Sequence, residues 1–244
     1  MKKIITSVFL IYVSFTLSAQ LTDSNLPIVI INTTNAVPIP DAPRITATMK
    51  IIYRGPGERN FVADQNDPSK LNYNGKIKIE IRGSSSQATP KKQYGFTTVL
   101  SDNITNNNVE LLGMPKENDW ILGGLAFDAS LIRDYISFNL SRKIGNYAPR
   151  QQYCEVIING DYRGLYMLQE KIKVDDNRVD IANIDPTDNT LPDLSGGYLT
   201  KADKVTSDDP SAWIMATYTG TQTDFIHETP KPSVITSAQH TYIK

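Results

Sequence analysis

The sequence KIKIEIR at residues 76–82 alternates strictly between apolar and charged side chains. A period of two is typical of an antiparallel strand with one face in the core and the other in water. Ile77, Ile79 and Ile81 are therefore expected to point into a hydrophobic core, while the charged side chains between them face solvent. This strand indicates that an antiparallel sheet dominates the fold.

Short strand-like segments lie on both sides of this stretch. Leu26–Ile31 is apolar and β-branched, Arg44–Tyr53 alternates, and Pro38 and Pro40 prevent continuous pairing between them. Further along, Asn159-Gly160 follows the strand-like run 153–158 and precedes a second run at 164–169, and this dipeptide is a strong signal for a tight hairpin. Weaker strand patterns occur at Tyr198–Ala202, Met215–Tyr218 and Thr223–His227.

One segment has helical periodicity instead. Asp128 is a good N-cap residue, and Gly145 offers a left-handed stop. Between them, apolar side chains recur at spacings of one, three and four: Leu131, Ile132, Tyr135, Ile136, Leu140 and Ile144. This pattern predicts a helix of about four turns with one buried face. The expected fold is therefore α+β, a mostly antiparallel sheet with one long helix packed on it.

Composition and motifs exclude several functional classes. The 244 residues include one Cys and two His, too few for an internal disulfide or a four-ligand zinc site. A formal net charge of -1 gives no overall positive field for nucleic acid. The usual glycine-rich nucleotide loops are absent, and Ser84–Ser86 lacks the G-x-S-x-G turn of a serine hydrolase.

Residues 1–19 have the features of a secretory signal peptide. Lys2 and Lys3 precede an almost uncharged run that ends at Leu17, and Ser18-Ala19 provides small residues for cleavage. The run is shorter than the roughly 20 residues that span a bilayer, so no stable membrane anchor is expected after cleavage. We expect the mature chain to be secreted or to reside in the cell envelope.

The segment RGSSSQATPKKQYGF at 82–96 has the composition of an anion-binding loop. Gly83 lets backbone N–H groups converge, Ser84, Ser85 and Ser86 offer hydroxyl donors, and adjacent lysines supply positive charge. These features fit a hairpin that grips phosphate groups. A solvated polar loop is the alternative, since serines and lysines are ordinary loop residues.

Four blocks of sequence occur in a fixed order: RGSSSQATPKKQYGF at 82–96, LLGMPKENDWIL at 111–122, DASLIRDYISFNLSRKIGNYAPR at 128–150 and YCEVIINGDYRGLYMLQEKI at 153–172. Together they resemble the CotH kinase family, whose members are secreted or spore-coat proteins with a divergent protein-kinase-like fold. The resemblance extends over residues 75–200. It implies that the chain forms the N-terminal part of such a fold.

The resemblance also implies a function, the ATP-dependent phosphorylation of Ser and Thr hydroxyls in a protein substrate at the cell surface or envelope. In this chemistry Mg²⁺ and cationic side chains neutralise the phosphates. Lys92, or its neighbour Lys91, would face the phosphates, and Glu170 would be its ion-pair partner. The expected nucleotide-binding residues are Arg82, Gly83, Ser84, Ser85, Lys91, Lys92 and Glu170.

The catalytic and metal-binding aspartates of that family are expected in a later segment that this sequence does not include. We therefore expect no catalytic residue in this chain, a truncated kinase-like unit, and weak binding of ATP and Mg²⁺ by the chain alone. The predicted division is a signal peptide at 1–19, a β-rich segment at 20–70, the CotH-like domain at 71–235, and the start of a helix at 236–244.

Two other functions stay open. A secreted surface or adhesion module would use the same scaffold without catalysis, because a fold does not determine a function. A carbohydrate-binding protein is the third interpretation, suggested by 12 Tyr and 2 Trp in an exported chain. That interpretation requires the tyrosines to line one exposed face.

Overall fold

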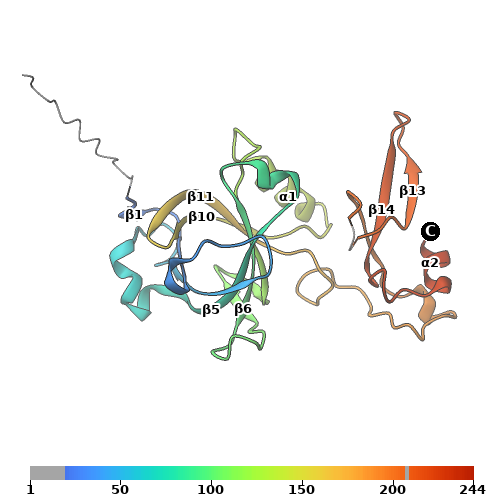
Figure 1. Ribbon diagram of the computed structural model, residues 1–244, viewed down its shortest axis with the longest axis horizontal. Coiled ribbons are helices and arrows are strands. Elements are labelled where there is room, and N and C mark those ends of the chain that lie inside the picture. The colour runs from blue at the N-terminus through green and yellow to red at the C-terminus, as the bar shows by residue number, and fades with distance from the viewer. Residues whose placement is uncertain (1–19, 207–208) are drawn as a thin grey trace, which may run out of the picture.

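The computed structural model, which describes residues 20–206 and 209–244, contains a closed seven-stranded β-barrel (Figure 1). The order around the barrel is β10-β11-β9-β6-β5-β3-β2, and a parallel pairing of β2 with β10 closes it. The other barrel pairs are antiparallel. The barrel strands are β2 (Ile28–Thr33), β3 (Ile45–Ile52), β5 (Leu71–Arg82), β6 (Gln93–Val99), β9 (Asp119–Gly123), β10 (Gln151–Ile158) and β11 (Asp161–Glu170).

The remaining described elements are short. Outside the barrel, β1 pairs with β4, β7 pairs with β8, and β12, β14 and β13 form a three-stranded sheet in that order. The strands are β1 (Asp23–Ser24), β4 (Asn60–Phe61), β7 (Val109–Leu111), β8 (Met114–Glu117), β12 (Leu199–Ala202), β13 (Trp213–Ala216) and β14 (Gln222–Thr229). The α-helices are α1 (Arg133–Lys143) and α2 (Ser237–Ile243), and single 3₁₀ turns occupy Thr34–Ala36, Val62–Asn66, Pro68–Lys70, Ser85–Ala88 and Asp193–Ser195.

Apolar side chains from all seven strands fill the barrel. The largest of them, Trp120, Tyr166 and Phe96, are essentially inaccessible to solvent. On β5, Ile77 and Ile79 are fully buried in the same core, which confirms the inward face predicted from the alternation. Each large side chain buried in this way stabilises the fold by about 1.5–3 kcal/mol, so the barrel is the main stable unit of the protein.

Several tyrosines also belong to this core. Tyr73, Tyr94 and Tyr166 are buried among the aliphatic side chains of the barrel. The tyrosines therefore do not gather on one exposed face, and the carbohydrate-binding interpretation loses the feature on which it rested.

The hairpin predicted at Asn159-Gly160 is present and joins β10 to β11. Ile158 pairs with Asp161, and both turn residues have positive φ, 52° at Asn159 and 80° at Gly160. Two positive φ values in succession match the twist of the flanking strands, which is why Asn-Gly favours this turn. The Asn159 Oδ1 also accepts a hydrogen bond of 2.9 Å from the Thr33 backbone N–H. The turn thereby fastens the hairpin to β2.

The prediction of an α+β fold with one long packed helix is wrong. The protein is mainly β, and α1 has 11 residues, none of them buried. Asp128 does accept a hydrogen bond from the Arg133 backbone N–H, and Gly145 does have a positive φ, but Leu131 interrupts the helix with a φ of 59°. Because the barrel fills its own interior, α1 lies outside it, and Ile136, for example, is 53% exposed. The kinase-like fold expected from the resemblance is wrong for the same reasons.

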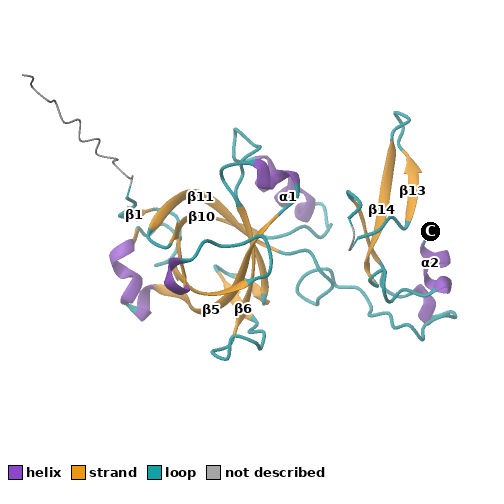
Figure 2. Ribbon diagram, in the orientation of Figure 1, coloured by secondary structure: helices purple, strands orange, loops and turns teal. Residues whose placement is uncertain are grey.

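The C-terminal part forms a separate small sheet that is joined to the barrel by an extended connection, as Figure 2 shows. Helix α2 begins with a capping box, in which Thr236 accepts from the Gln239 backbone N–H and the Gln239 side chain accepts from the Thr236 backbone N–H. This agrees with the capped helix expected from residue 236. We call β12, β13, β14 and α2 together the C-terminal unit.

The predicted boundary at residue 70 falls within the barrel, since β2 and β3 pair with β10 and β5. The predicted signal peptide lies outside the described residues. No helix in the described ranges is long and apolar enough to cross a membrane.

Candidate functional site

A cleft of about 500 Å³ lies where one end of the barrel meets the C-terminal unit. The barrel supplies the ends of β5, β9 and β11, and the C-terminal unit supplies β12, β14 and the residue that follows β12. One side chain of α1, Phe138, completes the wall. The lining residues are Arg82, Ile121, Phe138, Pro149, Gln169, Glu170, Lys171, Ile172, Leu199, Thr200, Lys201, Asp203 and Glu228.

Two cations of this cleft have no partner in the described part of the chain. Neither Arg82 nor Lys171 makes a side-chain ion pair or hydrogen bond there, and both side chains are exposed to solvent. Like-signed charges held without carboxylate partners favour an anionic ligand between them. The cleft therefore has local positive charge although the chain as a whole is slightly acidic.

The third cation, Lys201, is neutralised by acidic neighbours. Its Nζ lies 2.7 Å from Asp209 Oδ2 and 3.2 Å from Glu228 Oε2. Burial alone would raise the pKa of Glu228, but hydrogen bonds from Lys231 and Lys201 outweigh burial and hold that pKa below its usual value. Glu228 is therefore ionised at neutral pH, and Lys201 has less charge to offer a ligand than Arg82 or Lys171.

The Gly83–Ser86 loop, which follows Arg82, borders this cleft. Gly83 has a φ of +108°, and a Cβ there would lie 2.0 Å from Ser86 Oγ, so only glycine fits. Lys204, just after β12, donates from Nζ to Ser85 Oγ at 3.2 Å across the mouth of the cleft. The predicted residues Arg82, Ser84 and Ser85 thus lie at or next to the cleft, as the order of the chain requires.

Lys91 and Lys92 do not line the cleft. Lys91 Nζ donates to the Leu165 carbonyl oxygen and lies 4.9 Å from the centre of the Tyr166 ring, and burial there lowers the pKa of Lys91. Lys92 Nζ donates to the Gln87 carbonyl oxygen, while its own carbonyl accepts from the Tyr166 hydroxyl at 2.9 Å. Both lysines therefore hold the loop against the barrel.

Glu170 lines the cleft, but its partners are arginines. It is fully buried at the end of β11, where Arg150 Nη1 donates to Oε1 and the Arg150 backbone N–H donates to Oε2, both at 2.9 Å. Arg178 Nη1 also donates to Oε1. In the described residues Glu170 makes no ion pair with Lys92, so the predicted lysine–glutamate pair is not formed here.

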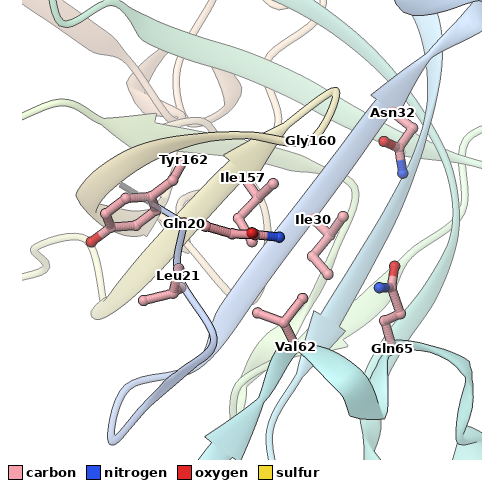
Figure 3. A pocket seen from close by; sticks show the side chains of 9 residues that line it. All are labelled: Gln20, Leu21, Ile30, Asn32, Val62, Gln65, Ile157, Gly160 and Tyr162. Atoms are coloured by element: carbon pink, nitrogen blue, oxygen red, sulfur yellow. The ribbon is translucent and has the colours of Figure 1, made fainter. Parts of the chain in front are cut away.

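A second cavity, of about 410 Å³, lies on the outside of the barrel near β2 and the β10–β11 hairpin (Figure 3). Its lining contains no charged side chain and no predicted site residue: Gln20, Leu21, Ile30, Asn32, Val62, Gln65, Ile157, Gly160 and Tyr162. Without a cation it has no means of neutralising phosphate. The cleft beside Arg82 is the better candidate for the site that the sequence predicts.

Comparison with known families agrees with the order of the sequence blocks. The family model described as CotH kinase protein matches residues 79–244, which is more than half of the chain. The chain belongs to the CotH kinase family. No curated protein matches the chain. The matched region of this CotH-family chain starts within β5 and includes the cleft, the connection and the C-terminal unit.

Sequence reasoning missed several residues that shape the site. Lys171 follows Glu170 directly and was quoted within LQEKI without being assigned a role. Phe138 carries the signal of the apolar helix face, although it lines a cleft rather than a core. Arg178 stands in a polar stretch, Asp175–Arg178, with no pattern that marks it. Its importance is visible only from its contacts.

Proposed function

We propose that the cleft binds the triphosphate of ATP and that the chain serves ATP-dependent phosphoryl transfer to protein hydroxyls, the activity implied by membership of the CotH kinase family. The observation that supports this proposal most is the pair of unpartnered cations, Arg82 and Lys171, in one cleft. Phosphoryl transfer depends chiefly on positioning and on neutralising the charge of the phosphates. These two side chains supply that charge.

The shape of the cleft also supports a nucleotide. Its volume of about 500 Å³ is within the range of small-molecule sites, which are mostly apolar with a few polar groups. Ile121, Phe138, Pro149, Ile172 and Leu199 form the apolar part. A base packs against such side chains while its phosphates reach toward Arg82 and Lys171.

The fit to Mg²⁺ is limited to one carboxylate. No group of three His, Cys, Asp or Glu side chains comes together among residues 20–206 and 209–244. Of the three carboxylates in the cleft, Glu170 and Glu228 are paired with basic side chains, whereas Asp203 makes no ion pair with a described residue. Mg²⁺ in nucleotide sites keeps several waters and needs only one or two carboxylates besides the phosphates. Asp203 is the residue that would contact it.

The proposal includes the expected setting of this activity. The first 19 residues support export, so the acceptor would be a protein at the cell surface or envelope. A surface module without catalysis shares the export signal and the scaffold. It does not require a nucleotide in the cleft, so nucleotide binding separates the two functions.

Isothermal titration of the full chain with ATP, with and without Mg²⁺, tests the proposal. Replacing both cations, Arg82→Ala with Lys171→Ala, should weaken ATP binding by at least about tenfold, because a hydrogen bond to a charged group is worth about 1.5–3 kcal/mol. Lys116→Ala is the matched control, since Lys116 is an exposed lysine of β8 outside the cleft. Equal affinity in all three proteins, or no saturable binding to the unmodified chain, would overturn the proposal.

A Lys92→Ala variant locates the phosphates. With the phosphates in the cleft, this change loosens the loop and weakens binding less than the double variant does. A loss as large as that of the double variant would move the phosphate site to Lys92 and the loop before it.

A further inference from the structure

The connection between the barrel and the C-terminal unit is tied to the barrel near its start. Residues 171–198 contain no strand or α-helix, only one 3₁₀ turn. Figure 1 shows this connection running from the barrel to the distant sheet. The first part folds back on itself: the Arg178 backbone N–H donates to the Asp175 carbonyl at 2.8 Å, and the Val179 backbone N–H donates to the Lys173 carbonyl at 3.1 Å. This turn carries Arg178 back to the barrel rim.

Arg178 is buried where two barrel strands end. Its side chain is fully inaccessible, donates to Glu170 on β11, and places its guanidinium 4.8 Å from the centre of the Trp120 ring on β9. Glu170 and Trp120 are register partners in the β9–β11 pair. The guanidinium is therefore held by an ion pair and by the face of an aromatic ring, a geometry that suits arginine better than lysine.

Neighbouring contacts hold the same turn. Lys173 Nζ lies 2.6 Å from Glu117 Oε1 and 3.2 Å from Asp119 Oδ2, and the Asn177 carbonyl accepts from Arg150 Nη1 at 3.1 Å. By contrast, Lys204 to Ser85 is the only hydrogen bond or ion pair between described residues of the barrel and of the C-terminal unit. The position of the C-terminal unit therefore depends on how the connection is held.

The unmade hydrogen bonds of Arg178 argue against a role in stability alone. Its Nε and Nη2 are buried without a hydrogen-bond partner among described residues. A buried charge with unmade hydrogen bonds costs free energy, and replacing a buried ion pair with apolar side chains of similar volume is often neutral or stabilising. Glu170 would also keep Arg150 if Arg178 were replaced.

From these contacts we infer that Arg178 is a positioning residue, which clamps the connection to Glu170 and Trp120 and so sets the distance across the ATP cleft. The inference rests on the proposed function for its consequence. The cleft residues Lys171 and Ile172 come just before the clamp, and Leu199, Lys201 and Asp203 come after it. Releasing the clamp separates the two walls while each wall keeps its own fold.

Three full-length variants test the clamp: Arg178→Met, which fills the space without charge; Arg178→Lys, which keeps the ion pair; and Arg163→Met, a control at an exposed arginine of β11 outside the cleft. Arg178→Met should speed amide exchange across residues 173–204 at least tenfold and raise the dissociation constant for ATP at least tenfold. The thermal midpoint of the barrel should stay within a few degrees. Arg178→Lys should restore ATP affinity to within about threefold of the unmodified chain, and Arg163→Met should change nothing.

The outcomes separate the clamp from the proposed function. Faster exchange in 173–204 in a chain that never binds ATP would keep the clamp and remove the nucleotide. Unchanged exchange in Arg178→Met would overturn the clamp. So would a loss of affinity that follows a lowered thermal midpoint without rescue by Arg178→Lys, because that result describes a merely structural residue. Faster exchange with unchanged ATP affinity would overturn the link between the clamp and the cleft.

Discussion

The barrel and the C-terminal unit are both built from antiparallel strands, yet different forces hold them. Strands from around the whole barrel meet in one apolar core, whereas the C-terminal unit buries only Ile226 and Pro230 among its described apolar residues. Its other buried side chains, His227 and Gln239, are polar. Ile214 and Met215 on β13 stay more than half exposed. Hydrogen bonds rather than apolar packing therefore give this unit its shape.

The difference predicts two levels of stability in one chain. Regions with few buried apolar contacts open at low free energy, and mobile binding elements come from such regions. A cleft between a rigid barrel and a loosely held sheet suits a ligand that draws the two together. The predictions below test how separate the two regions are.

The largest effect is expected in the barrel core. Phe96→Ala should lower the free energy of unfolding by about 3–5 kcal/mol, because it leaves a cavity in a close-packed interior, as a urea titration would measure. The matched change Ile226→Ala should leave the barrel transition in place and speed amide exchange only in residues 199–243. A barrel transition shifted equally by both changes would mean that the two regions unfold together, and the comparison would fail.

A smaller, pH-dependent effect is expected in the C-terminal unit, which contains both histidines of the chain. His227 Nε2 and His240 Nδ1 lie 2.9 Å apart and join β14 to α2. Burial, and then the charge of His240, lower the pKa of His227 below its usual value of 6.5. The unfolded unit thus binds more protons than the folded one, so stability present at neutral pH is lost as the pH falls from about 6.5 toward that lowered pKa.

The surroundings of His227 offer little compensation for a proton. His240 faces it from α2 and Trp213 from β13, while Lys201 and Glu228 already pair with each other on β12 and β14. Each unit of pKa difference corresponds to about 1.4 kcal/mol. Amide exchange in β14 and α2, corrected for intrinsic rates, should be faster at pH 5 than at pH 7.5, and barrel exchange should not change. Persistence of this dependence in His227→Gln would assign it to another group.

The smallest effect is expected at the cap of α2. Thr236→Ala removes the capping box and should cost about 1 kcal/mol, confined to the short helix. Exchange at Ser237–Ile243 measures it, with Thr241→Ala as a control inside the same helix. A change in barrel exchange would show that α2 is coupled more tightly to the rest than its contacts indicate.

Local features could be predicted from the sequence because neighbouring residues determine them. The alternation of β5, the Asn159-Gly160 turn and the capped helix at 236 each depend on a few adjacent side chains. Partnership between distant segments could not. Periodicity showed that residues 131–144 have an apolar face, but not whether any surface was left to cover it.

The candidate site divides in the same way. Arg82, at the end of the most regular strand, was identified from sequence, and Glu170 was identified with the wrong partner. The partner, Arg178, comes back to Glu170 only because the connection turns at Asp175. A charge in a polar stretch gives no sign of burial, so this contact had to be observed.

The parallel pairing that closes the barrel has a consequence for how the chain folds. Ile28–Ile31 pair with residues 155–158, more than a hundred positions later. Contacts so distant in sequence make folding slow, since a long loop must be ordered before the contact forms. During synthesis β2 waits for β10 to be made, and until then an apolar strand edge stays open to other chains. Dependence on chaperones should therefore be greatest in the interval before residue 158 emerges from the ribosome.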